Sequence, residues 1–369
     1  MQEQRRARVG FGSFAGRAAA LSVLLAVVGS WTVALVAGNP RAEFNRAGNI
    51  LIADQFNNRV IEVTPNGDIV WQFGIGPDDF SPRSILGCND AERVGPHTLM
   101  AGTGIPPGVD PAAPNGAADN RVILVNPAGH ITWQYGQFGV TGSGPNQLNT
   151  PVQCTCLPDR SILITDQANE RIIQVSWQKD IVWQYGTTGV AGIGPNELNN
   201  PNSAELLDNG HILIADENNN RAIEVDRDKN IVATFTAGGT VSGVAFASRL
   251  PNGNTLITDS NNSRIVEVDP NDKPVWHYFT NTDPKSNPTP LPTRALRLKN
   301  GNTIISDQFN ARVIIIDPKL NIVAQYGNLN QPGFGLQNTS QGLNEPYDAK
   351  VIGDYTGITA PGARFARDD

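Results

Sequence analysis

The 369-residue sequence is poor in charged residues and in cysteine. Lys, Arg, Asp and Glu make up 17% of the chain, below the usual level of about a quarter, which leaves too little polar surface for a helical bundle or a coiled coil. The 35 acidic residues outnumber the 28 basic ones, so no basic stripe is available to bind a nucleic acid. Three cysteines are too few for a disulfide scaffold and too scattered for a four-ligand zinc site. The chain instead has 37 Gly and 26 Pro, which is typical of a fold with many turns.

Long apolar runs are confined to the N-terminus. Residues 18–37 are almost entirely apolar and follow four arginines, Arg5, Arg6, Arg8 and Arg17. This pattern indicates an export signal or an N-terminal membrane anchor over residues 1–38. We therefore expect the folded part, residues 39–355, to lie outside the cytoplasm, either secreted or periplasmic or anchored to the membrane, with membrane contact only through this segment. Residues 356–369 are expected to form a tail.

One repeated motif fills the rest of the chain. In five copies a hydrophobic strand ends in Asp and continues as Asp-x-x-Asn-x-Arg, with the arginines at Arg59, Arg171, Arg221, Arg264 and Arg312. A sixth, degenerate copy has Gly102 in place of the Asp and resumes at Asn120 and Arg121. The six arginines are 43–62 residues apart, a spacing typical of four-stranded propeller blades.

The two ends of the repeat region predict a closed ring. The first blade begins near Phe44, directly at its second strand, and so lacks an innermost strand. The segment 346–352 matches the innermost strand predicted at 201–207. If this segment completes blade one, no sheet edge is left open. We therefore predict an all-β, six-bladed propeller of four-stranded blades, closed by the C-terminal strand.

The repeat unit Pro-x-x-Ala, then Asn-Gly-x-Ile/Leu-x-Ile-x-Asp-x-x-Asn-x-Arg, resembles the NHL repeat of six-bladed, TolB-like propellers. The resemblance covers residues 44–355. The segment 250–257, followed by Val275-Trp276, is also similar to the repeats of arylsulfotransferase propellers. The resemblance implies the fold and not an activity, because this architecture is used by both enzymes and binding modules.

The innermost strands carry polar residues that differ from blade to blade, as a site requires. We expect a binding site at the channel mouth formed by Asp90, Glu92, Gln153, Glu205, Arg294, Asp348 and Lys350. Four of these, Asp90, Glu92, Glu205 and Asp348, offer the oxygen ligands that Ca²⁺ prefers. Among propellers of related fold, those of gluconolactonase and paraoxonase hold a calcium ion in the corresponding channel, but their ligand motifs do not match this sequence residue for residue. Alternatively, the basic residues neutralise the acids in a polar, water-filled pore.

Histidine and cysteine give little support for catalysis. His97, His130 and His211 are predicted in turns at the end opposite the mouth, and His277 on an outermost strand. General acid–base catalysis and sulfuryl transfer at the mouth are therefore disfavoured, as is a catalytic thiol. Export permits a disulfide, and the expected pairing is Cys88 with Cys154 or with Cys156.

Two proline-rich loops, Gly102–Asp119 and Thr280–Pro292, break the symmetry on the mouth side. Loops of this length are usually functional or disordered, and their prolines lower the entropy cost of presenting a surface. We expect a scaffold that binds an unidentified protein or small molecule through its mouth face. The alternatives are a calcium-dependent hydrolase of lactonase or esterase type in the channel and an arylsulfotransferase-like transferase.

Overall fold

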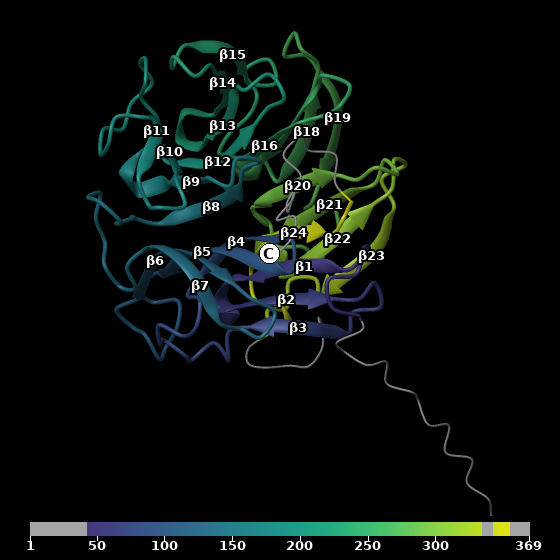
Figure 1. Cartoon of the computed structure of the whole chain (residues 1–369). Coiled ribbons are helices and arrows are strands. Elements are labelled where there is room, and N and C mark those ends of the chain that lie inside the picture. The colour runs from purple at the N-terminus through teal and green to yellow at the C-terminus, as the bar shows by residue number, and fades with distance from the viewer. Residues whose placement is uncertain (1–42, 334–341, 355–369) are drawn as a thin grey trace, which may run out of the picture. The chain divides into compact units, whose positions relative to one another are not determined.

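Six four-stranded antiparallel sheets make up the computed structural model, which describes residues 43–333 and 342–354. The sheets are arranged as blades around a central axis, with their innermost strands nearest to it (Figure 1); we call the space between these strands the channel. With the innermost strand first, blade 1 consists of β24 (Pro346–Val351), β1 (Ile50–Asp54), β2 (Arg59–Val63) and β3 (Ile69–Phe73). Blade 2 consists of β4 (Cys88–Val94), β5 (His97–Ile105), β6 (Ala117–Val125) and β7 (Ile131–Gly136). Blade 3 consists of β8 (Pro151–Cys156), β9 (Ile162–Asp166), β10 (Arg171–Val175) and β11 (Ile181–Tyr185).

Blades 4 to 6 repeat the same order. Blade 4 consists of β12 (Pro201–Leu206), β13 (Ile212–Asp216), β14 (Arg221–Val225) and β15 (Ile231–Phe235). Blade 5 consists of β16 (Val244–Arg249), β17 (Thr255–Asp259), β18 (Arg264–Val268) and β19 (Pro274–Phe279). Blade 6 consists of β20 (Arg294–Arg297), β21 (Thr303–Asp307), β22 (Arg312–Ile316) and β23 (Ile322–Gly327). The predicted all-β, six-bladed propeller is therefore confirmed.

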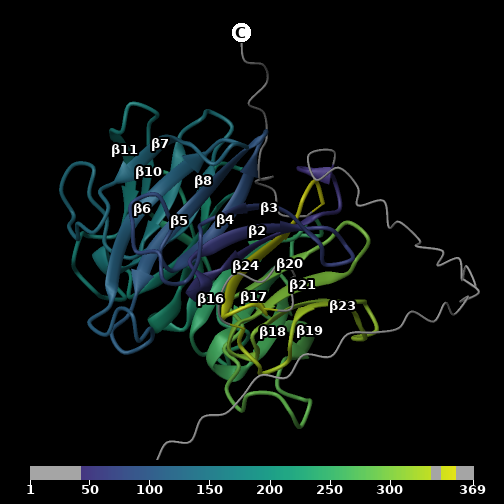
Figure 2. The ribbon, with the colours of Figure 1, turned by 90° about the horizontal axis from the view of Figure 1, so that it is seen from below.

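The C-terminal strand closes the ring, as predicted. β24 pairs antiparallel with β1, with Ala349 opposite Ile52 and Val351 opposite Ile50. In Figure 2 the yellow β24 runs beside the purple strands of the first blade. Chain segments almost 300 residues apart thus share one sheet, and the described innermost strands leave no gap in the ring.

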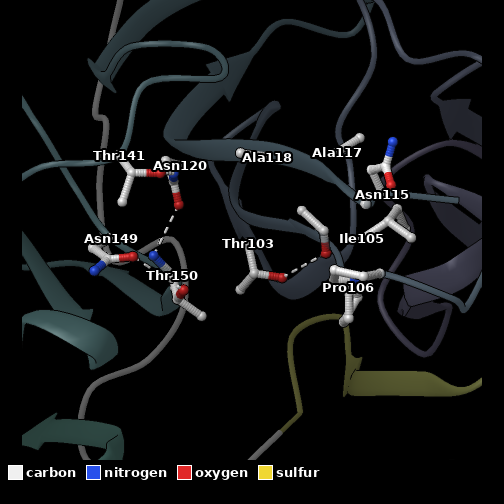
Figure 3. Close-up of a pocket in the computed structure, with 13 residues that line it drawn as sticks. Thr103, Ile105, Pro106, Asn115, Ala117, Ala118, Asn120, Thr141, Asn149 and Thr150 are labelled. Atoms are coloured by element: carbon white, nitrogen blue, oxygen red, sulfur yellow. Dashed lines mark hydrogen bonds between the residues drawn. The ribbon is translucent and has the colours of Figure 1, made fainter. Parts of the chain in front are cut away.

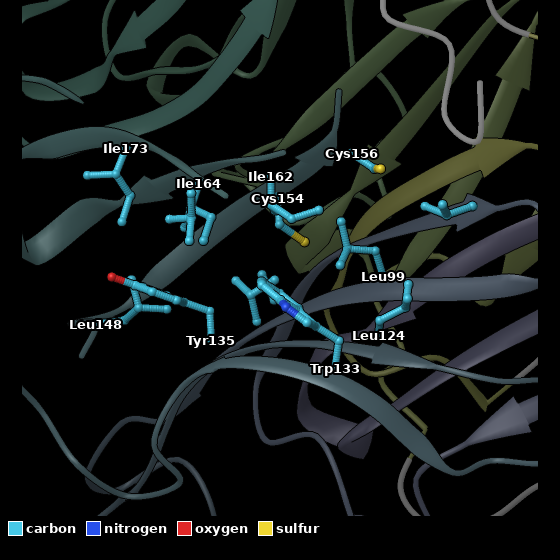
Figure 4. Packing of buried hydrophobic residues seen from close by; sticks show 14 residues of the cluster. Leu99, Leu124, Trp133, Tyr135, Leu148, Cys154, Cys156, Ile162, Ile164 and Ile173 are labelled. Carbon is cyan, nitrogen blue, oxygen red and sulfur yellow. The ribbon is translucent and has the colours of Figure 1, made fainter. Parts of the chain in front are cut away.

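Six apolar clusters lie between neighbouring blades, one at each junction. Successive side chains of a strand point to opposite faces, so Ile50 and Ile52 contact blade 6 while Leu51 contacts blade 2. Both faces of each blade are buried, which explains why the second strands are continuously apolar rather than alternating. Figure 4 shows the junction of blades 2 and 3, where Trp133 and Tyr135 lie against residues of β8 and β9.

The Asp-x-x-Asn-x-Arg motif builds the turn after the second strand in blades 1, 3, 4, 5 and 6. In blade 3, Asp166 Oδ2 accepts from Asn169 at 2.8 Å and from Arg171 at 2.8 Å. Its Oδ1 accepts from the backbone N–H of Asn149, in the connection that enters the same blade. The turns form the short 3-10 helices η1 (Gln55–Asn57), η2 (Gln167–Asn169), η3 (Glu217–Asn219), η4 (Ser260–Asn262) and η5 (Gln308–Asn310). The motif is therefore structural, as its repetition indicates.

Blade 2 replaces this turn with a longer hairpin, in which β5 and β6 stay paired as far as Ile105 and Ala117. Its degenerate copy has Gly102 where the others have Asp, and Asp119 on β6 supplies the carboxylate instead. Asp119 pairs with Arg121 at 2.5 Å and accepts from the backbone N–H of Leu86 at 2.8 Å. A Cβ on Gly102 would lie 2.8 Å from the Asp119 carboxyl. The glycine thus leaves the space that the relocated carboxylate occupies.

The predicted export segment, residues 1–38, and the predicted tail, residues 356–369, lie outside the described residues. Within the described part of the chain, no helix has the length and apolar character needed to cross a membrane.

Candidate functional site

Five innermost strands begin with a β-bulge. In β4, β8, β12, β16 and β24 the pairing register shifts around the second residue and leaves it unpaired. A bulge re-aims the side chain of its extra residue. These residues are Asn89, Val152, Asn202, Ala245 and Tyr347. They lie at the end of the channel where the innermost strands begin, which we call the mouth face.

Tyr347 spans the channel in this layer. Its hydroxyl oxygen lies 2.9 Å from Nδ2 and 3.2 Å from Oδ1 of Asn202. The two residues belong to blades 1 and 4, which are opposite each other in a ring of six. Asn202 also donates to Glu217 at 2.8 Å, and burial raises the pKa of that carboxyl. Because Tyr347 and Asn202 are themselves 8% and 2% exposed, this bridge separates the deeper channel residues from the mouth face.

Four charged side chains fill the middle of the channel. Lys350 Nζ lies 2.7 Å from Asp90 Oδ1 and 2.5 Å from Asp348 Oδ2. The Arg294 guanidinium lies 3.0 Å from Asp348 Oδ1 and 3.4 Å from Asp90 Oδ1, and its carbon lies 4.5 Å from the ring centroid of Phe246. Two positive and two negative charges therefore balance each other in a buried cluster, which we call the channel ion cluster.

Charge attraction outweighs burial at Asp90 and Lys350, whereas at Asp348 burial outweighs the two cations and raises the pKa of that carboxyl. Within the described residues the three guanidinium nitrogens of Arg294 lack hydrogen-bond partners of good geometry, so its contacts with the carboxylates are ion pairs. Burial raises the pKa of Asp90, but the charges of Lys350 and Arg294 outweigh it and hold that pKa below its usual value. Burial lowers the pKa of Lys350, but the two aspartates outweigh it and raise that pKa. Both shifts keep the Asp90–Lys350 pair ionised.

Most of the predicted site residues also link neighbouring innermost strands. An innermost strand is paired on one side only, so its remaining backbone N–H groups need other acceptors. Asp90 accepts from the N–H of Cys154 at 3.1 Å, and Glu92 accepts from that of Cys156 at 2.7 Å. The same link joins Gln153 to Ala204 at 2.5 Å, Glu205 to Arg249 at 2.9 Å and Asp348 to Ala91 at 3.2 Å. Each link runs from one blade to the next, so these side chains hold the ring together.

A small cavity adjoins the channel ion cluster. Five of the seven predicted site residues line it, namely Glu92, Gln153, Glu205, Arg294 and Lys350. Its volume of about 30 Å³ has room for about one water molecule. Ligand pockets usually have about 300–1,000 Å³. The structure thus brings the predicted residues together, but around a space too small for an organic substrate.

The predicted calcium ligands do not fit a calcium ion. Ca²⁺ takes about six to eight oxygen ligands, whereas the channel carboxylates already bind backbone N–H groups and the cations of Lys350 and Arg294. Among the residues that the structure describes, no three His, Cys, Asp or Glu side chains are arranged to hold a metal ion. We therefore derive no metal chemistry from the channel.

We expect Glu92 to make the stability of the ring depend on pH. Burial raises the pKa of Glu92 to about 8, and the charge of Lys350 only partly offsets this. Between the unfolded value near 4.5 and about 8, the folded chain holds a proton that the unfolded chain lacks, so stability falls as pH rises. The Glu92→Gln variant stays neutral and is expected to gain on the order of 2 kcal/mol relative to wild type between pH 5 and pH 8.

Urea unfolding at pH 5, 6.5 and 8 measures this difference. Glu43→Gln, in an exposed ion pair with Arg46, is the control for loss of one carboxyl group. Parallel pH profiles for wild type and Glu92→Gln would contradict the prediction.

The predicted disulfide is wrong. Cys88, Cys154 and Cys156 are free and buried. Cys88 lies in the apolar cluster between blades 1 and 2, whereas the other two lie between blades 2 and 3, so the sheet of blade 2 separates them. Burial raises the pKa of Cys88 and Cys154, which keeps these thiols protonated and unreactive.

The histidines lie away from the mouth face, as predicted. His97 begins β5 opposite Val94, at the far end of β4. His211 precedes β13 and its Nδ1 lies 2.7 Å from Glu224. His130 stands in the turn before β7, and His277 lies on the outermost strand β19. None of the four lines the described pockets.

Two larger pockets lie on the mouth face, one on each side of the hairpin formed by β5 and β6, which we call the mouth hairpin. One has about 420 Å³ and is bounded by this hairpin and by the connection from blade 2 to blade 3. In Figure 3, Asn120 and Thr150 stand across from Thr103 and Ile105. The other has about 370 Å³ and lies between the hairpin and blade 1. Ile105 lines both pockets, so the predicted proline-rich loop is the wall that they share.

The second predicted loop lies against its neighbouring blade. The backbone N–H of Asn287 donates to Asn310 Oδ1 at 2.7 Å, and that of Phe309 donates to the carbonyl of Pro290 at 2.9 Å. These bonds join Thr280–Pro292 to η5, and no residue of the loop lines either large pocket.

Comparisons with known proteins add the fold but no family. No family model matches the chain, and no curated protein matches it in sequence. A protein of unknown function from Bacteroides caccae is similar in structure, with a TM-score of 0.52 and 13% identity over 76% of this chain and 93% of that one. A streptogramin B lyase is similar with a TM-score of 0.50 and 13% identity over 79% and 81% of the two chains. At this identity the similarities show the propeller fold alone.

Proposed function

We propose that this chain is an exported binding protein that recognises a small molecule or a partner protein with its mouth face, at the two pockets beside the mouth hairpin. The observation that carries this proposal is the contrast in size. Pockets of about 420 and 370 Å³ flank the hairpin, whereas the channel encloses about 30 Å³. The first two volumes lie within the range of ligand sites.

The basic and then apolar pattern of residues 1–38 is typical of an export segment and supports the proposal that the propeller lies outside the cytoplasm. The hydrolase alternative required calcium at the channel acids, and those acids are bonded within the ring. The transferase alternative required a histidine near the substrate, and the histidines lie elsewhere. Binding is therefore the function that we propose.

Shortening the mouth hairpin is expected to abolish ligand binding while the ring stays folded. In the test variant an Asn-Gly turn replaces residues 106–116, which lets Ile105 and Ala117 flank a two-residue hairpin loop. A fragment library is screened against the full chain by saturation-transfer NMR. We expect fragments that bind wild type to lose at least about tenfold in affinity, because both pockets lose a wall.

Ile193→Ser is the matched control. Ile193 is 64% exposed on the connection between blades 3 and 4 and lines neither large pocket. Fragments that bind the shortened variant as well as wild type would refute this location of the site.

A further inference from the structure

The pocket between the mouth hairpin and blade 1 combines apolar walls with acidic side chains. Its apolar lining consists of Phe56, Pro77, Ile105, Val109, Pro111 and Pro332. Asp78, Asp110 and Glu345 are its acidic residues, and no Lys, Arg or His is among the described residues that line it. Such a lining favours a positively charged group with an apolar body.

Glu345 is the acid for which the ring offers no partner. It immediately precedes β24 and has a φ of 53°, the left-handed conformation that Thr150 and Asn200 adopt at the same point of their blades. Its Oε2 is buried and, within the described part of the chain, has no hydrogen-bond partner. Burial raises the pKa of Glu345 to about 7. A carboxylate oxygen that is buried without a partner is costly, and a cationic ligand would remove that cost.

We propose that this pocket binds an alkylammonium group, with Glu345 as its counter-ion and the apolar walls around its stem. The inference rests on the proposed function, because it assigns a ligand class to one of the two pockets. Phe56 also lines the pocket, and aromatic rings attract cations. A bare metal ion is not the expected ligand, since the described acids form no metal-binding group. A free amine and a lysine side chain carry the same chemistry.

The probes are n-hexylamine, n-hexanol and hexanoate, titrated into the full chain at pH 8 and followed by NMR. We expect hexylamine to bind at least about tenfold more tightly than hexanol, because a hydrogen bond to a charged group exceeds a neutral one by this factor. Hexanoate is expected not to bind. Glu345→Gln is expected to remove the preference for the amine, and its thermal unfolding confirms that the ring is intact.

Glu197→Gln is the matched control. It removes one carboxylate from a mouth-side connection, and the twin connection already has Gln147 there, with both side chains accepting from a glycine N–H. This variant should bind hexylamine like wild type. Glu345 must lose its proton to act as the counter-ion, and its pKa is about 7. The affinity of wild type for hexylamine should therefore rise about tenfold from pH 6 to pH 8. The other titratable groups that line the pocket are Asp78 and Asp110, both acids.

A capped lysine, N-acetyl-lysine methylamide, distinguishes the two sources of the ammonium group. Tighter binding of the capped lysine indicates a protein partner, and tighter binding of hexylamine indicates a small amine. Equal binding of hexylamine and hexanol, or full hexylamine binding by Glu345→Gln, overturns the inference. Suppose that one of these two results overturns the inference. If fragment binding is still lost when the mouth hairpin is shortened, the proposed binding function stands without the alkylammonium inference. If fragment binding does not depend on the hairpin, the proposed function and the inference both fail.

Discussion

Replacing Arg294 with methionine is expected to lower the free energy of unfolding by about 3–5 kcal/mol, the usual cost of removing one partner from a buried ion pair. Arg294 is 1% exposed, and both carboxylates that it contacts are fully buried. Without its guanidinium, Asp90 and Asp348 share the single charge of Lys350. Urea unfolding of the purified chain measures the loss.

A double-mutant cycle separates charge from packing. Asp348→Leu alone leaves two cations facing Asp90 and should be about as destabilising as Arg294→Met. The double variant restores the balance, with Lys350 paired to Asp90 at 2.7 Å. It should therefore lose clearly less than the sum of the two single variants. Additive losses would mean that the channel ion cluster contributes shape and not charge.

Cooperation among the channel residues explains their diversity. They differ between blades, as site residues do, yet their contacts are with each other and with backbone N–H groups. Asp90, for example, contacts Lys350, Arg294 and the N–H of Cys154. The four charged side chains at the axis of this ring balance one another as a single group. Each of them therefore has a different part in the group, and the residue type changes from blade to blade. Variation from blade to blade is therefore as typical of a structural ion cluster at the axis as of a binding site.

The sequence was sufficient for the fold because its signals are local and repeated. The apolar second strand of each repeat, the turn motif that follows it, and the C-terminal segment that matches an innermost strand each specify strand pairing within one blade. The channel residues were correctly predicted to converge. Their accessibility was not, because the contact of Tyr347 with Asn202 joins residues 145 positions apart and depends on a β-bulge. No periodic pattern in a single strand indicates such a bulge.

The disulfide prediction failed for a related reason. It placed Cys88 near Cys154 by strand position alone, but the face of blade 2 to which each thiol points decides whether they meet. The pockets were indicated only by the length of the loop Gly102–Asp119. Glu345 gave no signal at all, because the pocket that it lines is formed with a hairpin far away in the sequence.

Asp119→Ala is expected to cost about 3–5 kcal/mol, because it leaves the charge of Arg121 buried with two carbonyls and the ring of Phe138 but no carboxylate. Arg121 is 1% exposed, and its remaining hydrogen bonds go to the backbone oxygens of Pro82 and Ser84. Thermal and urea unfolding should both report the loss. A loss below about 1 kcal/mol would show that this carboxylate has no special role in the hairpin.

Gly102→Asp should have opposite effects in two backgrounds. In wild type its Cβ would lie 2.8 Å from the Asp119 carboxyl and 2.6 Å from Ile85 Cδ1, so it should destabilise by overpacking and by adding a second buried acid. In the Asp119→Ala background the same substitution provides the carboxylate from the position that the other five blades use, and it should recover most of the lost stability. Such a reversal of sign would mean that each blade requires a carboxylate beside its arginine, whichever strand provides it. If Gly102→Asp destabilises both backgrounds equally, blade 2 has diverged too far in its backbone to accept the turn of its neighbours.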